Sequence, residues 1–232
     1  MALHYVIVQQ PSTDPAQLFL LYHGVNDNPD SMAQIGSWFA RAFPEAQVVA
    51  VGAPLPGSVP QGRKWFAEIP AHDRSEQQGV NAAMPEFVES VRHWQQQSGV
   101  RPEATALIGF SQGSTMVLEG VKAQPDLAGR VVAFSGRYAT LPERASTRTT
   151  IHLIHGEYDD QIPMQHAEEA AQRLTALGGD VTLDIVEDLP HAIDHRSMEL
   201  ALNHLRYTVP KRYFDEALSG AKPGDDDVVM MV

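Results

Sequence analysis

The sequence contains no cysteine, little positive charge and no long apolar run. Without cysteine the chain can form no disulfide, use no thiol nucleophile and bind no metal through thiolates. Lysine and arginine number 17 against 29 aspartates and glutamates, which gives a formal net charge of −12. This charge argues against binding nucleic acid or an anionic membrane through a basic surface. It also disfavours a negatively charged substrate, unless the site that binds it is locally basic.

Neither a targeting segment nor a membrane span is predicted. The first residues, Met1 to Val8, lack the basic region of a secretory signal, and their apolar run is short. No stretch approaches the ~18 consecutive apolar residues that indicate a transmembrane helix. We therefore expect a cytoplasmic protein.

The length of 232 residues suits one domain with a single core. We expect residues 1–220 to form this domain and residues 221–232 to form a tail that is first acidic and then apolar. The three consecutive aspartates of the tail are expected to be solvated, because no further ligands are arranged around them for a cation. The apolar end could pack on the body or on a second subunit, so a homodimer is left open.

Segments typical of strands and helices alternate, which predicts an α/β fold with a mostly parallel central sheet and helices on both faces. Runs typical of strands are Leu18–Tyr22, Gln47–Val51, Ala104–Ile108, Arg130–Phe134, Thr150–Ile154 and Val181–Val186. Helical spacing of apolar residues is found in Asp30–Phe43, Ala82–Gln97, His166–Leu177 and His195–Arg206. Asp30 is expected to cap the first of these helices. The stretch Ala53–Asp73, rich in proline and glycine, predicts an irregular loop or lid.

The pentapeptide Gly109-Phe110-Ser111-Gln112-Gly113 lies between a strand-like run and the helix-like run Ser114–Glu119. A Gly-x-Ser-x-Gly sequence in this context predicts a nucleophile elbow, in which the serine occupies a tight strand-to-helix turn with its hydroxyl exposed. The flanking glycines let the backbone pass through the turn without a Cβ clash. Ser111 is therefore the candidate nucleophile.

A serine hydroxyl is a poor nucleophile unless a base removes its proton, and the base must be held in the right tautomer. In an α/β hydrolase the acid and then the base follow the serine along the chain, each in a loop after a strand. The candidates for the acid, all in the loop after the fifth predicted strand, are Glu157, Asp159 and Asp160. The candidate base is His191, which follows the strand Val181–Val186 and is preceded by the conformationally fixed Pro190.

An oxyanion is stabilised by preorganised backbone N–H donors. One donor is expected from Gln112, which follows the nucleophile at a helix N-terminus, where the helix dipole favours negative charge. The other is expected from Val25, in the loop after the first apolar strand, where Gly24 lets the backbone approach closely. His23 and Asp27 in this loop have no third ligand at a recognisable spacing, so no metal site is predicted.

These motifs resemble those of the phospholipase/carboxylesterase group of α/β hydrolases, which includes bacterial carboxylesterases and acyl-protein thioesterases. Leu21–Asp27 is similar to the family's early oxyanion loop, and the elbow also matches in the glutamine that follows Ser111. His155–Pro163 resembles the acid loop, and its register implies Asp159 as the acid. His191 corresponds to the family's base, although a proline stands before it where the family usually has glycine.

The resemblance extends from about Leu18 to Leu205. The segment Arg63–Phe66 is similar to one that borders the acyl pocket in the family, which implies Trp65 and Phe66 as substrate-binding residues. By physical reasoning alone, Trp65 is equally well explained as a core aromatic. The end of the chain is similar to that of an enterobacterial esterase branch, which implies activity on short acyl esters.

The resulting hypothesis is a carboxylesterase-type serine hydrolase that cleaves short-to-medium acyl esters through an acyl-enzyme, with a small-molecule substrate and no cofactor. An acyl-thioesterase or lysophospholipase acting on longer chains is the alternative within this class. A lactone hydrolase of the kind that uses cysteine is disfavoured because the chain has none. A non-catalytic binding protein of the same fold is disfavoured because all three positions of the triad are filled.

Overall fold

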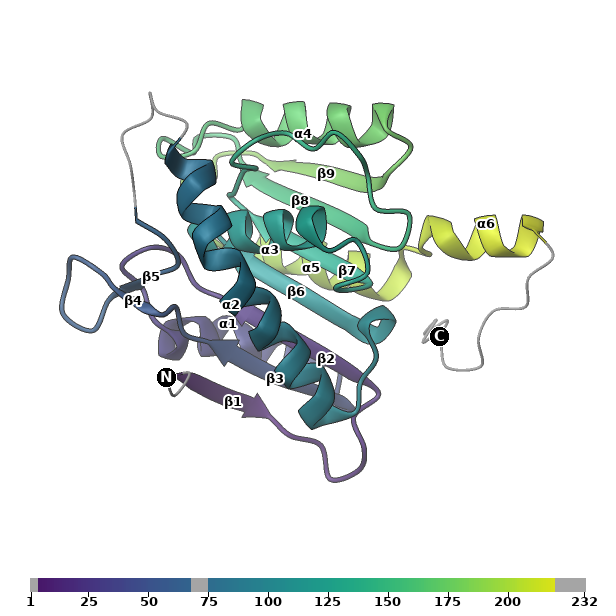
Figure 1. The fold of residues 1–232 in the computed structure, drawn as a ribbon, viewed down its shortest axis with the longest axis horizontal. Coiled ribbons are helices and arrows are strands. Elements are labelled where there is room, and N and C mark those ends of the chain that lie inside the picture. Colours follow the sequence, from purple (N-terminus) through teal and green to yellow (C-terminus); the bar gives the residue numbers. More distant parts are fainter. Residues whose placement is uncertain (1–3, 68–74, 220–232) are drawn as a thin grey trace.

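The computed structural model describes residues 4–67 and 75–219. Within these ranges a seven-stranded sheet in the order β1-β3-β2-β6-β7-β8-β9 forms the centre of the protein (Figure 1). Its strands are β1 (Tyr5–Gln9), β2 (Gln17–Tyr22), β3 (Ala46–Val51), β6 (Thr105–Phe110), β7 (Arg130–Phe134), β8 (Thr150–Gly156) and β9 (Asp180–Val186). β1 pairs antiparallel with β3, and the other neighbours are parallel. The predicted α/β fold is confirmed.

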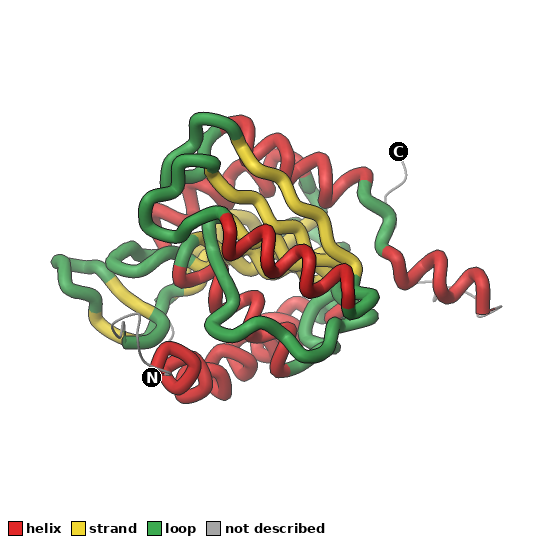
Figure 2. The backbone as a smooth tube through the Cα atoms, turned by 90° about the horizontal axis from the view of Figure 1, so that it is seen from above, coloured by secondary structure: helices red, strands yellow, loops and turns green. Residues whose placement is uncertain are grey.

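Helices cover both faces of this sheet (Figures 1 and 2). The helices of the described residues are α1 (Pro29–Ala42), α2 (Ser75–Ser98), α3 (Gln112–Ala123), α4 (Gln165–Ala176), α5 (His195–Tyr207) and α6 (Lys211–Ser219), with a short 3-10 turn at Pro102–Ala104. One core lies between the sheet and α2, α3 and α4, and a second core lies between the sheet and α1 and α5. α6 extends away from the body (Figure 1).

Alternate residues of β2 enter the two cores. Leu18, Leu20 and Tyr22 belong to the core beneath α2, α3 and α4. Phe19 and Leu21 belong to the core beneath α1 and α5. Because successive side chains of a strand point to opposite faces, a strand buried on both faces is apolar throughout, as this one is. Each fully buried aliphatic or aromatic side chain of this size stabilises the fold by roughly 1.5–3 kcal/mol.

The expected cap of the first helix is wrong. The N-cap of α1 is Asn28, whose Oδ1 accepts hydrogen bonds from the backbone amides of Asp30 at 3.0 Å and Ser31 at 3.2 Å. Pro29 then occupies the first helical position, where its missing N–H costs no intrahelical bond. Asn28 is of a type favoured at the N-cap, and Pro29 is of a type favoured at the first helical position. Asp30 lies instead in the first turn of the helix.

The second helix is longer than expected, because α2 begins at Ser75 rather than at Ala82. Val80 is fully buried in the same core as Phe87 and Val91, so the apolar stripe of the helix continues towards its N-terminus. Pro85 lies inside the helix, where proline removes a backbone donor, and it obscures the helical pattern in the sequence.

The stretch Ala53–Asp73 is not wholly irregular. It contains a short antiparallel hairpin formed by β4 (Leu55–Pro56) and β5 (Arg63–Lys64), while its last part, like the predicted tail at 221–232, lies outside the described residues. Arg63 exchanges backbone hydrogen bonds with the loop after β2, from Asn26 N to Arg63 O and from Arg63 N to Asp27 O, both 2.8 Å. The hairpin is therefore fixed to the loop that is expected to bind the oxyanion.

None of the helices in the described part of the chain combines the length and the apolar character that a membrane crossing needs.

The assignment of Asn28 as the N-cap of α1 can be tested by mutation. Replacing Asn28 with alanine leaves two backbone amides without their acceptor, so Asn28→Ala is expected to lower the free energy of unfolding by about 1 kcal/mol. Urea denaturation followed by circular dichroism measures this loss. Asp30→Ala is the matched control and is expected to cost clearly less. A larger loss for Asp30→Ala than for Asn28→Ala would contradict the assigned cap.

Candidate active site

Ser111 occupies the turn between β6 and α3 with φ of 54° and ψ of −118°, a strained conformation for a residue other than glycine. The backbone is tightly packed around this turn. A Cβ on Gly113 would lie 2.1 Å from Tyr22 O, and a Cβ on Gly109 would lie 2.5 Å from Ser114 N. Both positions therefore require glycine, and the strand–turn–helix context predicted from the motif is present.

His191 connects Ser111 to Asp159. Its Nε2 lies 3.0 Å from Ser111 Oγ and its Nδ1 lies 2.7 Å from Asp159 Oδ2. The His191 side chain is 7% exposed and that of Asp159 is 0% exposed. The three residues follow β6, β8 and β9, so the parallel sheet brings them together at its carboxyl edge.

The hydrogen-bond partners of His191 define its tautomer. Because the Asp159 carboxylate only accepts, Nδ1 carries the proton, and Nε2 is left to accept from the Ser111 hydroxyl. This is the arrangement that a general base needs. The ring of Phe110 lies 4.9 Å from the His191 ring between centroids and packs against it at an angle of 39°.

Backbone amides hold the Asp159 carboxylate. Its Oδ1 accepts from Gln161 N at 3.0 Å and from Ile162 N at 2.8 Å. Burial by itself raises the pKa of this carboxyl, but the hydrogen bonds from Ile162, His191 and Gln161 outweigh burial and hold the pKa below its usual value. The group is therefore ionised at neutral pH and stabilises a proton on His191.

Of the three carboxylates left open by the sequence pattern, Asp159 is the one hydrogen-bonded to His191. Glu157 instead accepts from the backbone amide of Asp188 at 3.2 Å. Asp160 is exposed. Asp159 and Asp160 are adjacent in the loop, yet the Asp159 side chain contacts His191 whereas Asp160 is exposed.

The loops that carry Asp159 and His191 are joined by backbone hydrogen bonds. Glu157 N donates to Val186 O at 3.0 Å, and Tyr158 N donates to Leu189 O at 2.9 Å. Gly156 lies at the crossing, where a Cβ would be only 2.3 Å from Leu189 O. Any side chain at position 156 would push the two loops apart, which explains the glycine after His155.

His155 contributes to the site, although the sequence analysis gave it no role beyond beginning the segment that resembles the acid loop. Its Nε2 lies 2.7 Å from Ile162 O and 3.2 Å from Asp159 Oδ2. Burial lowers the pKa of His155, so the ring is neutral and donates from Nε2. The imidazole packs beside the Asp159 carboxylate and ties the end of β8 to the loop that holds it. Its position four residues before Asp159 was the only signal in the sequence.

The loop after β2 runs against the elbow. A Cβ on Gly24 would lie 3.3 Å from Ser111 Cβ and 3.2 Å from Phe110 Cδ1. Within the described residues the amides of Val25 and Gln112 donate to no protein acceptor, so both are available to a ligand. Their assignment as oxyanion donors stays a prediction.

The Gln112 side chain holds the segment that contains Trp65 and Phe66. Its Oε1 accepts from Trp65 N at 2.7 Å, and its Nε2 donates to Phe66 O at 3.1 Å. Trp65 Nε1 also donates to His23 O at 2.8 Å. Both aromatic side chains are buried in the core, and Trp65 lines a small, mostly apolar pocket together with Phe87 and other side chains of α2 and α3. A substrate-binding role for Trp65 and Phe66 stays a prediction.

Both ring nitrogens of His23 are engaged by the backbone. Nδ1 lies 2.7 Å from Gly24 O, and Nε2 accepts from Ala53 N at 3.0 Å. Burial lowers the pKa of His23, so the ring is neutral and connects the loop after β2 to the residues after β3. Across the described ranges, no group of three histidine or carboxylate side chains is arranged to hold a metal ion.

Three comparisons show which known proteins the chain is similar to. The profile of the phospholipase/carboxylesterase family matches residues 3–209. The chain is 60% identical to the esterase YpfH of Escherichia coli strain K12, over 98% of each chain. It is 25% identical to acyl-protein thioesterase 1 of Gibberella zeae, over 83% of this chain and 91% of the relative. Among solved structures, the esterase PE8 superimposes with a TM-score of 0.78 at 27% identity, covering 90% of this chain and 100% of that one.

The close contact between Gly156 and Leu189 O predicts the effect of a side chain at position 156 on activity. Gly156→Ala is expected to separate the two loops and to lower kcat/KM for a p-nitrophenyl ester by about 100-fold, because misplacing a catalytic group by roughly 1 Å has this effect. Steady-state hydrolysis measures the change, with circular dichroism to show that the variant is folded. Gly79→Ala in α2, where the nearest atom to the new Cβ is at an ordinary 3.4 Å, is the control and is expected to retain activity. Full activity in Gly156→Ala would contradict the account.

Proposed function

This chain belongs to the phospholipase/carboxylesterase family of α/β hydrolases and is a carboxylesterase-type hydrolase, and we propose that Ser111, His191 and Asp159 are its catalytic residues. The observation that carries the proposal is the unbroken chain of hydrogen bonds from Ser111 Oγ through His191 to Asp159. A serine next to a correctly oriented and buried imidazole is an activated nucleophile.

The proposed reaction has two steps. In the first, Ser111 Oγ attacks the ester carbonyl while His191 Nε2 takes its proton, and the Asp159 carboxylate stabilises the resulting imidazolium. The amides of Val25 and Gln112 bind the oxyanion of the tetrahedral intermediate. His191 then gives its proton to the departing alcohol. In the second step, water attacks the acyl-serine by the same route and releases the acid.

The proposed substrate is a small acyl ester with a short-to-medium acyl chain. The relative at 60% identity is named an esterase, whereas the relatives named acyl-protein thioesterases are much less similar, as the one at 25% identity illustrates. The protein groups supply each proton transfer, so the proposed reaction needs no metal or organic cofactor. A cytoplasmic location and a homodimer stay predictions.

A second candidate, hydrolysis of longer acyl esters or thioesters, is favoured by one observation. A small, mostly apolar pocket beside Trp65 is lined by Ala83, Phe87 and Met116. Trp65 is itself bonded to the Gln112 side chain, so the pocket wall is connected to the proposed oxyanion hole.

The proposed roles predict a graded loss of activity. Ser111→Ala is expected to lower kcat for p-nitrophenyl butyrate by about 10⁶-fold. Asp159→Asn is expected to lower it by about 10⁴-fold, because the amide favours the wrong tautomer of His191. The control is Asp160→Asn, at the exposed neighbouring position, which should hydrolyse the ester at the wild-type rate. Equal losses in the two asparagine variants would contradict the role of Asp159.

The substrate class is tested by a series of p-nitrophenyl esters from acetate to palmitate. We expect kcat/KM to be highest for the short and medium chains and to fall for the long ones. A maximum at palmitate would contradict the short-chain proposal and would favour a thioesterase or lysophospholipase. Parallel assays with acyl-coenzyme A thioesters separate these two remaining activities.

A further inference from the structure

A cleft of about 420 Å³, including its open mouth, lies at the amino edge of the sheet, away from Ser111. It borders the first residues of β2, β6 and β7 and the start of α6, whereas the catalytic residues follow the carboxyl ends of their strands. The polar side chains that line the cleft are Gln17, Glu103, Thr105, Arg130 and Arg212. Neither the proposed catalysis nor the sequence motifs use any of them.

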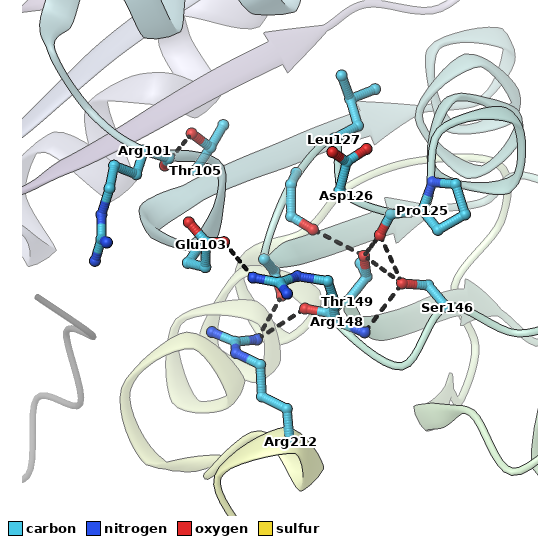
Figure 3. Close-up of polar contacts among 12 residues, drawn as sticks. Arg101, Glu103, Thr105, Pro125, Asp126, Leu127, Ser146, Arg148, Thr149 and Arg212 are labelled. Atoms are coloured by element: carbon cyan, nitrogen blue, oxygen red, sulfur yellow. Dashed lines mark hydrogen bonds and ion pairs between the residues drawn. The ribbon is translucent and has the colours of Figure 1, made fainter. Parts of the chain in front are cut away.

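Arg212, the second residue of α6, is 8% exposed. Its Nη1 donates to Arg148 O at 3.0 Å and Gly129 O at 3.3 Å, and Figure 3 shows the guanidinium directed at these carbonyls. Its Nη2 donates to Tyr213 Oη at 3.3 Å. Its buried Nε has no hydrogen-bond partner within the described structure. A buried charged donor without a partner is costly.

Arg130, the first residue of β7, also lines the cleft. Its Nη2 donates to Thr208 O at 2.6 Å, and its Nη1 donates to His152 Nε2 at 3.1 Å. His152 accepts this bond because burial lowers its own pKa and keeps the ring neutral. Burial, followed by the nearby charge of Arg212, lowers the pKa of Arg130 to about 10. The Arg130 guanidinium is therefore charged at neutral pH.

The ion pairs found among the described residues involve neither the Arg130 nor the Arg212 guanidinium. Glu103, the acidic residue of the lining, pairs instead with Arg148 at 2.5 Å (Figure 3). Asp180 acts on Arg130 from farther away, and its Oδ2 accepts from Thr150 Oγ1 and Lys211 N. Desolvating two like charges without a counter-ion is unfavourable, and an anion in the cleft would offset this cost.

We propose that this cleft is a binding site for a small anion that carries a phosphate group, held between Arg130 and Arg212. Guanidinium groups form short, charge-assisted bonds with phosphate oxygens, often in pairs. In a chain whose net charge is −12, such a locally basic cleft is where an anion would concentrate.

Isothermal titration of the full chain with inorganic phosphate, at ionic strength held constant with chloride, tests the proposal. We expect one saturable site in the wild type. Arg212→Gln is expected to weaken binding about tenfold or more, since it removes a charge-assisted contact. Glu103→Gln is expected to strengthen binding severalfold, because it removes the negative charge that lines the cleft.

The Glu103 variant also keeps the test valid if Arg212→Gln fails to fold, because Glu103 is partly exposed. Arg41→Gln, at an exposed arginine of α1, is the control and should bind phosphate as the wild type does. The absence of saturable binding in the wild type would overturn the proposal. Binding that is equal in the wild type and in both cleft variants would also overturn it, since the phosphate would then lie elsewhere.

Discussion

The hydrogen bond from His191 Nδ1 to the buried Asp159 carboxylate fixes the geometry on which the rest of the site depends. It selects the tautomer that presents a free Nε2 lone pair to Ser111. The bond exists because two loops after β8 and β9 are joined through backbone hydrogen bonds across Gly156. Amides of the same loop keep the carboxylate ionised despite its burial. Local backbone packing thus determines the chemistry of the side chains.

The two edges of the parallel sheet have different characters. At the carboxyl edge, Trp65 is hydrogen-bonded to the Gln112 side chain and to His23 O. These bonds hold the segment after β5 against the two loops that carry the proposed oxyanion donors. At the amino edge, Arg130 and Arg212 gather positive charge in a protein that is acidic overall. The proposed catalysis and the proposed anion binding therefore lie at opposite edges of one sheet.

Much of this arrangement could be predicted from the sequence, because strong local patterns carry it. The alternating segments predicted the sheet, and the elbow motif placed Ser111 between a strand and a helix. The pattern could not separate Asp159 from its neighbours, since side-chain direction within a loop depends on backbone bonds such as those from Gln161 and Ile162. The cleft around Arg130 and Arg212 gave no signal, because only the tertiary fold brings these residues together.

The central claim is that Ser111 is an activated nucleophile. Intact-mass spectrometry after treatment with a fluorophosphonate probe tests it most directly, because the probe reacts covalently with activated serines. The account predicts that the wild type gains the mass of one probe and that Ser111→Ala gains none. Equal labelling of both proteins, or no labelling of a folded wild type that small esters can enter, would contradict it.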